Sequence, residues 1–188
     1  MLLRYKKAVS VLFIAAQLCV LTPSYAGEKS NLLAGTVYEQ VGVQENLDPF
    51  LLYSISLLES AGHSKSVNRG YIAPSPYAIR GPEGAFYPQS YAEAVKILNQ
   101  QISKHGRRKL DIGLMQINGQ HWLEAKHPES LFNPYNNVRL GAKILMHGLK
   151  DGADLELAIG RYHSPTDWRA RIYGARVLAV YSNLRGFR

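Results

Sequence analysis

The segment Asp111-Ile112-Gly113-Leu114-Met115-Gln116-Ile117-Asn118 is the most informative stretch of the 188-residue chain. Its apolar residues alternate around Gly113, Gln116 and Asn118, a pattern that predicts a compact turn or a short helix with its apolar side chains buried and its amides facing a cleft. An amide carries donors and an acceptor without a charge, so it suits the hydroxyl and N-acetyl groups of a sugar. The segment predicts a glycan-binding element.

A second informative segment lies upstream, where Asp48-Pro49 precedes an almost continuous apolar stretch. An aspartate cap and a proline at the first helical position predict a helix that starts here and ends near Ser60-Ala61-Gly62. Glu59 is the one acidic residue in the stretch and lies in its last turn. Burial and the partial negative charge of a helix C-terminus both disfavour a carboxylate, so Glu59 is a candidate general acid for cleaving a glycosidic bond. A carboxylate paired with a local cation is the alternative.

Cap and turn signals divide the rest of the chain. Two short apolar runs flank Gly81-Pro82-Glu83-Gly84 and predict a β-hairpin. Ser90-Tyr91-Ala92-Glu93 is a capping box that opens a helix to about residue 105. Asn133-Pro134 opens a helix to about residue 150, Asp154 caps one to about residue 162, and residues 164–167 start a last helix toward residue 183. We therefore expect a mainly helical α+β domain with a small β-hairpin or irregular insert.

The first 26 residues have the features of a signal peptide. A basic start is followed by an apolar run of roughly 14 residues, shorter than the ~20 of a membrane-spanning helix, and by small residues before Gly27. We expect export to the periplasm or cell envelope, with no stable membrane span once residues 1–26 are removed. An uncleaved anchor is the alternative. Residues 27–188 are expected to form one domain.

Composition and the few reactive side chains exclude several function classes. The chain has 22 Lys and Arg against 14 Asp and Glu, a net charge of +8, or +5 without the three basic residues of the leader. Cys19 is the only cysteine and lies in the leader, so the mature chain offers no disulfide and no thiol. The six histidines include no H-E-x-x-H motif, and we expect no metal and no other cofactor. Without a groove-reading or stacking motif, nucleic acid is not an expected partner.

Three motifs follow one another along the chain: Leu58-Glu59-Ser60, the string at 113–118, and Ala158-Ile159-Gly160-Arg161-Tyr162-His163. Together they resemble the motifs of the lysozyme-like lytic transglycosylases of SLT type, and Tyr173 resembles the tyrosine of that family's closing helix. The resemblance covers about residues 45–182. It implies a lysozyme-like fold and cleavage of the β-1,4 bond between N-acetylmuramic acid and N-acetylglucosamine in peptidoglycan, with formation of 1,6-anhydro ends.

The same resemblance implies roles for individual residues. Glu59 would be the sole catalytic acid and base: it protonates the leaving oxygen and then accepts the proton of the muramoyl C6 hydroxyl as that oxygen attacks C1. Met115 is expected to wall the cleft. For Tyr162 and Tyr173, core packing is the alternative. The residues implied to bind sugar or to position Glu59 are Ser60, Met115, Gln116, Asn118, Tyr162, His163 and Tyr173.

Two features depart from the common family pattern. The third motif often reads Tyr-Asn, whereas this chain has Tyr162-His163. The interval between Glu59 and Gly113 is long, and it resembles a branch found beside conjugation, pilus and secretion machinery, whose components are then expected partners along with peptidoglycan. We expect this insert, about residues 64–110, to border the glycan cleft, with Tyr77 stacking on a sugar face. A remote structural flap is the alternative.

Asp111 leaves a second chemistry open. Animal lysozymes resemble this stretch too, and use an aspartate two positions before the glycine as their second carboxylate. A retaining hydrolase needs two carboxyl groups about 5 to 5.5 Å apart, and an inverting one about 6.5 to 9.5 Å apart. The sequence does not give that distance, so a lysozyme-type hydrolase using Glu59 and Asp111 stays an alternative. A non-catalytic glycan-binding or assembly protein is the third.

Overall fold

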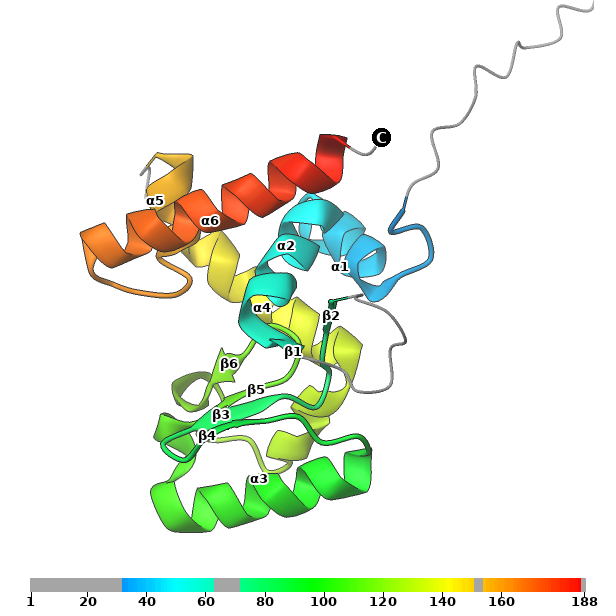
Figure 1. Cartoon of the computed structure of the whole chain (residues 1–188), viewed down its shortest axis with the longest axis vertical. Coiled ribbons are helices and arrows are strands. Elements are labelled where there is room, and N and C mark those ends of the chain that lie inside the picture. Colours follow the sequence, from blue (N-terminus) through cyan, green and yellow to red (C-terminus); the bar gives the residue numbers. More distant parts are fainter. Residues whose placement is uncertain (1–31, 63–71, 151–153, 187–188) are drawn as a thin grey trace, which may run out of the picture.

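Six α-helices and two small antiparallel sheets make up the part of the chain that the computed structural model describes, residues 32–62, 72–150 and 154–186. The proposed signal peptide and part of the insert lie outside the described residues. In Figure 1, α3 lies along one side of the larger sheet and the other helices gather on the opposite side. The expected α+β, mainly helical fold is confirmed. The helices are α1 (Val37–Glu45), α2 (Pro49–Ser60), α3 (Tyr91–His105), α4 (Pro134–Lys150), α5 (Leu155–Gly160) and α6 (Asp167–Gly186).

Helix α2 runs through the middle of the core and starts where the sequence predicts. The carboxylate of Asp48 accepts a hydrogen bond from the backbone N–H of Phe50 at 2.8 Å, and Pro49 occupies the first helical position. Phe50, Leu52 and Ile55 are buried, so the helix is held in place by its apolar side chains. Its last turn then places Glu59 at the boundary between the helices and the larger sheet.

None of the helices in the described part of the chain combines the length and the apolar character that a membrane-spanning helix needs.

The larger sheet has the strand order β4-β3-β5-β6. Strands β3 (Ile79–Gly81) and β4 (Gly84–Phe86) form the predicted hairpin, while β5 (Asp111–Ile112) pairs with β3 and with β6 (Ile117–Asn118). Strands β1 (Ala61–Gly62) and β2 (Ala73–Pro74) form the smaller sheet. Three 3-10 helices complete the described elements: η1 (Arg107–Lys109), η2 (Gly119–His121) and η3 (Pro128–Phe132).

The register of the larger sheet sorts its side chains onto two faces. Ile79 pairs with Ile112, which pairs with Ile117, and all three are buried. Their neighbours form a polar row, because Arg80 pairs with Asp111 and Asp111 pairs with Asn118. Since side chains alternate along a strand, the polar row lies on the face opposite the isoleucines.

The turn between β5 and β6 is fastened to α4. Asn137 accepts from the N–H of Met115 at 2.8 Å and donates to the carbonyls of Ile112 at 2.9 Å and Leu131 at 3.0 Å. Gly113 has a φ of 81°, and a Cβ there would lie 2.0 Å from the side-chain nitrogen of Asn137. Only glycine fits, in conformation and in space. Residues 111–118 therefore form a hairpin around a compact turn, and the expected alternative of a short helix is wrong.

Helices α5 and α6 pack with their backbones in contact. A Cβ on Gly160 would lie 1.9 Å from the carbonyl oxygen of Ala170, and one on Gly174 would lie 1.9 Å from that of Glu156. Helix α6 also packs on α2 and buries Tyr173 and its neighbours against the core. The short loop between α5 and α6, which carries residues 161–166, is held at both ends because the two helices that it joins are packed together.

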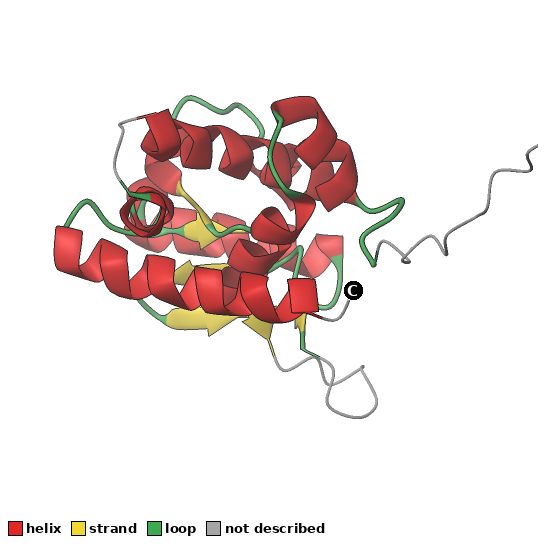
Figure 2. Ribbon diagram, turned by 90° about the horizontal axis from the view of Figure 1, so that it is seen from above, coloured by secondary structure: helices red, strands yellow, loops and turns green. Residues whose placement is uncertain are grey.

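In the view of Figure 2, the strands lie behind the helices.

Candidate active site

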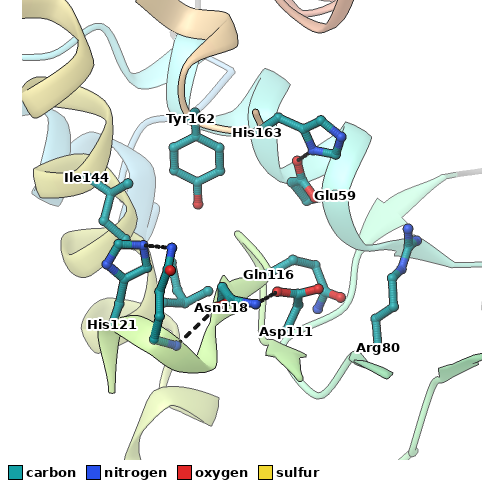
Figure 3. A pocket seen from close by; sticks show the side chains of 11 residues that line it. Glu59, Arg80, Asp111, Gln116, Asn118, His121, Ile144, Tyr162 and His163 are labelled. Carbon is teal, nitrogen blue, oxygen red and sulfur yellow. Dashed lines mark hydrogen bonds and ion pairs between the residues drawn. The ribbon is translucent and has the colours of Figure 1, made fainter. Parts of the chain in front are cut away.

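A hollow of about 480 Å³ opens where the end of α2, the polar row of the sheet and the loop after α5 meet (Figure 3). Its lining is mostly polar and comes from segments far apart in the sequence. The residues that line it are Glu59, Arg80, Asp111, Gln116, Ile117, Asn118, Gln120, His121, Ile144, Tyr162 and His163.

Glu59 reaches this hollow from the last turn of α2, with only 12% of its side chain exposed. Its buried oxygen Oε1 makes no hydrogen bond within the described residues. The closest cationic partner is Nδ1 of His163, 3.6 Å from Oε1, which is beyond hydrogen-bond length. A buried acceptor without a partner is costly to maintain, so the site favours a hydrogen-bond donor beside this oxygen.

His163 is held beside Glu59 by stacking. Its imidazole lies parallel to the ring of Tyr173, with the ring centroids 4.6 Å apart and 2° between the planes. The adjacent Glu59 carboxylate raises the pKa of His163 above its usual value, although partial burial opposes this. Burial, and then the charge of Glu59, raises the pKa of Tyr173 far above its usual value, so its hydroxyl stays protonated. The carboxylate thus lies beside one titratable cation and one neutral phenol.

Asp111 lies across the hollow from Glu59 (Figure 3). Its Oδ1 accepts a hydrogen bond from Nδ2 of Asn118 at 2.8 Å. Burial is the main cause that raises the pKa of Asp111, and the charge of Glu59 acts in the same direction; Asn118, Arg80 and His163 partly offset them. The site therefore holds two carboxyl groups in one hollow, with the charged form of Asp111 disfavoured.

Two hydroxyl groups fix the turn at 113–116 relative to its surroundings. Ser60, at the end of α2, donates to the carbonyl of Leu114 at 2.7 Å, and Tyr162 donates to that of Met115 at 2.6 Å. Burial, followed by the charges of Glu59 and Asp111, raises the pKa of Tyr162 far above its usual value. These contacts tie the turn to both the helix that carries the acid and the loop that carries His163.

Gln116 presents one end of its amide to the hollow. Its φ of 44° turns the backbone at this position. The side-chain nitrogen uses its two donors on the carbonyls of Ala78 at 3.2 Å and Gly113 at 3.0 Å. The remaining group is the carbonyl oxygen, an acceptor suited to a sugar hydroxyl or an amide N–H.

Six of the residues singled out from the sequence line the hollow together: Glu59, Asp111, Gln116, Asn118, Tyr162 and His163. Ser60 and Tyr173 lie immediately behind this lining, where they contact the turn and His163.

The other two candidates lie elsewhere. Met115 is fully buried beneath the turn, against Gly141 of α4, instead of forming a wall of the hollow. Tyr77 packs edge-on against Tyr91 and Phe132, outside the lining of the hollow.

Five lining residues were not among the candidates from the sequence: Arg80, Ile117, Gln120, His121 and Ile144. Arg80 belongs to the insert, and it borders the hollow because β3 pairs with β5. The alternation of an apolar residue, Ile79, with the polar Arg80 is typical of a strand and could be recognised in the sequence, but the strand that pairs with it could not be predicted. His121 and Ile144 come from η2 and α4, whose approach to the site depends on packing between distant segments. No group of three or more potential metal ligands occurs in the described part of the chain.

A family model for the Transglycosylase SLT domain matches residues 37–167. The chain belongs to this family. Comparisons with curated proteins and with solved structures gave no match. Membership confirms the resemblance of the motifs and implies a glycan-cleaving lytic transglycosylase whose substrate is peptidoglycan, a polymer of the cell envelope. In this SLT domain the matched region contains every residue that lines the hollow, whereas Tyr173, which supports His163, lies beyond it.

Proposed function

We propose that this SLT domain cleaves the β-1,4 bond between N-acetylmuramic acid and N-acetylglucosamine and leaves 1,6-anhydro ends. The observation that carries the proposal is the placement of Glu59: its buried Oε1 has no hydrogen bond among the described residues, and its side chain lines a hollow together with the amides of Gln116 and Asn118. An acid shielded from water and free of strong partners can give a proton to a leaving oxygen. The amides of Gln116 and Asn118 supply uncharged groups for recognition of N-acetyl sugars.

The proposed reaction needs one proton carrier. Glu59 donates its proton to the glycosidic oxygen as the bond from that oxygen to C1 breaks. The muramoyl C6 hydroxyl then attacks C1, and its proton passes to Glu59, which restores the acid. No water enters the product. Asp111, across the hollow, would stabilise the positive charge that develops at C1 when its carboxyl group is ionised.

A lysozyme-type hydrolase is the second candidate, because Asp111 lies opposite Glu59 in the same hollow. In a retaining hydrolase Asp111 would be the nucleophile and water would release the product. The two reactions leave different ends on the glycan. Digestion of purified peptidoglycan followed by mass spectrometry should give anhydro ends, which are lighter than reducing ends by one water. Reducing ends would support the hydrolase, and intact strands would support a non-catalytic glycan-binding or assembly protein.

We further propose that the protein is exported, with cleavage near Ala26-Gly27, and opens the wall locally for a secretion, pilus or conjugation apparatus. The leader pattern and the long interval between Glu59 and Gly113 support this proposal. N-terminal sequencing of the exported protein should give a chain starting near Gly27. Deleting the gene should impair assembly of the apparatus but not growth, and a copy encoding Glu59→Gln should fail to restore assembly. Restoration by that variant would point to a role without catalysis.

A further inference from the structure

A second hollow, of about 690 Å³, adjoins the first between α4, η2 and the loop after α5. The two hollows form one continuous surface, because their linings share five residues: Gln120, His121, Ile144, Tyr162 and His163. The new part adds residues from α4 and from the loop at 161–165. We call it the basic hollow, because the lining residues that can carry a positive charge are Lys143, Arg161 and three histidines, at positions 121, 147 and 163.

The two hollows differ in charge. The first is lined by two carboxyl groups, Glu59 and Asp111, and by Arg80. The basic hollow has no aspartate or glutamate in its lining. A carboxylate on a ligand is therefore attracted to the basic hollow more strongly than to the first hollow.

The charge of Lys143 is available to a ligand. Lys143 and His147 lie one turn apart on α4, both exposed, and neither forms an ion pair with another described residue. Arg161 is less available, because its guanidinium contacts Asp167 at 2.6 Å and the carbonyl of Pro165. Burial lowers the pKa of His121, which therefore contributes hydrogen bonding more than charge. Lys143 is the principal cation of the basic hollow.

We propose that the basic hollow binds a carboxylate of the peptidoglycan strand through Lys143, with His147 beside it. The inference rests on the proposed function and adds a charged subsite to it. A muramoyl residue carries a carboxylate in one of two places. The carboxylate lies on the peptide stem, or on the lactyl group of the sugar once the stem is removed. Either would direct the strand so that neutral sugar reaches Glu59 while the acidic group lies beside α4.

The test compares binding of soluble glycan fragments to Glu59→Gln proteins, which do not consume the ligand. The probes are fragments with intact peptide stems, the same fragments after amidase treatment, and neutral chitohexaose. Lys143→Glu is compared with Lys143→Ala and with Lys96→Ala, which removes an exposed charge from α3. We expect Lys143→Glu to weaken binding of an acidic fragment about tenfold and Lys143→Ala about fivefold. Both losses should shrink as salt is raised, and Lys96→Ala should bind like its parent.

The outcomes separate the two sources of carboxylate and the two proposals. A loss confined to stem-bearing fragments assigns the site to stem carboxylates, and a loss confined to stripped fragments assigns it to the lactyl group. Unchanged binding of both acidic fragments overturns the inference, as does an equal loss with chitohexaose. If the protein with Glu59 intact cleaves nothing while binding still depends on Lys143, the proposed function fails and the charged subsite stands.

Discussion

Nδ1 of His163 lies 3.6 Å from Oε1 of Glu59, while the same imidazole stacks on Tyr173. The family motif often has asparagine at this position. Asparagine does not titrate and histidine does, so the surroundings of Glu59 depend on pH in this protein. The pKa of His163 is raised by Glu59, which means that the folded protein binds this proton more tightly than the unfolded chain does. The stabilisation is fully present below the unfolded pKa of about 6.5 and is lost as pH rises through the folded pKa.

We therefore expect His163→Asn to lower the melting temperature more at about pH 5.5 than at about pH 8.5. The imidazole is half exposed, so the effect should be at most about 1 kcal/mol. His147→Asn, at an exposed position on α4 with no ion pair to another described residue, is the control. A difference that is the same at both pH values would show that the Glu59 contact contributes nothing.

Glu59→Gln should remove the acid and the base together. Activity on peptidoglycan should fall by at least the ~10²- to 10⁴-fold that general acid–base catalysis contributes, with the melting temperature retained because the amide has a similar size. Asp111→Asn should cause a partial loss, with anhydro products kept. An Asp111→Asn protein as inactive as Glu59→Gln, in an enzyme that makes reducing ends, would favour the hydrolase.

Asn137→Ala should destabilise the fold by about 2 to 4 kcal/mol, because it leaves the N–H of Met115 and the carbonyls of Ile112 and Leu131 without their buried partner. Urea unfolding at equilibrium measures the loss. Asn136→Ala is a matched control one residue away, exposed and with a single side-chain hydrogen bond to Ser130. It should cost less than about 1 kcal/mol. Equal costs would mean that Asn137 does not hold the turn.

Tyr77→Ala should lower stability by about 1 to 3 kcal/mol, because Tyr77 packs against Tyr91 and Phe132. Glycan binding should stay unchanged, since Tyr77 lies outside the lining of the hollow. Tyr77→Phe keeps the ring and should preserve both properties. Weaker glycan binding at an unchanged melting temperature would instead support the stacking role expected from the sequence.

Local signals were sufficient where one side chain sets an element's start. The Asp48 cap and the capping box at Ser90 predicted the starts of α2 and α3. Asp48 accepts from the N–H of Phe50 and Ser90 from that of Glu93, whereas the Glu93 carboxylate accepts from the N–H of Gln89 instead of Ser90. Helix α1 was missed although a signal was present: Thr36 accepts from the N–H of Glu39, and Glu39 accepts from that of Gly35. The last helix starts at Asp167, two residues after the expected proline, although Ser164 accepts from the N–H of Thr166 as a helix cap would.

The positions of some site residues depend on contacts between segments far apart in the sequence, and these positions could not be predicted. Arg80 reaches the hollow because it pairs with Asp111, 31 positions later in the chain, and no local pattern specifies that partner. Met115 was expected at the cleft, but the hydrogen bonds of Asn137 hold its backbone so that its side chain packs into the core under Gly141. Motif spacing identified which residues gather around Glu59, and packing between distant elements decided which of them face the ligand.

The contact between α5 and α6 also determines how far the protein can be truncated from its C-terminus without losing support for the site. The family match ends at residue 167, the first residue of α6. A truncated protein with that boundary would lose Tyr173, on which His163 stacks, and Gly174, which lies against the backbone of α5. The shortest fragment that retains the support for its own acid therefore extends through α6. The region that the family model matches therefore ends before the folded domain does.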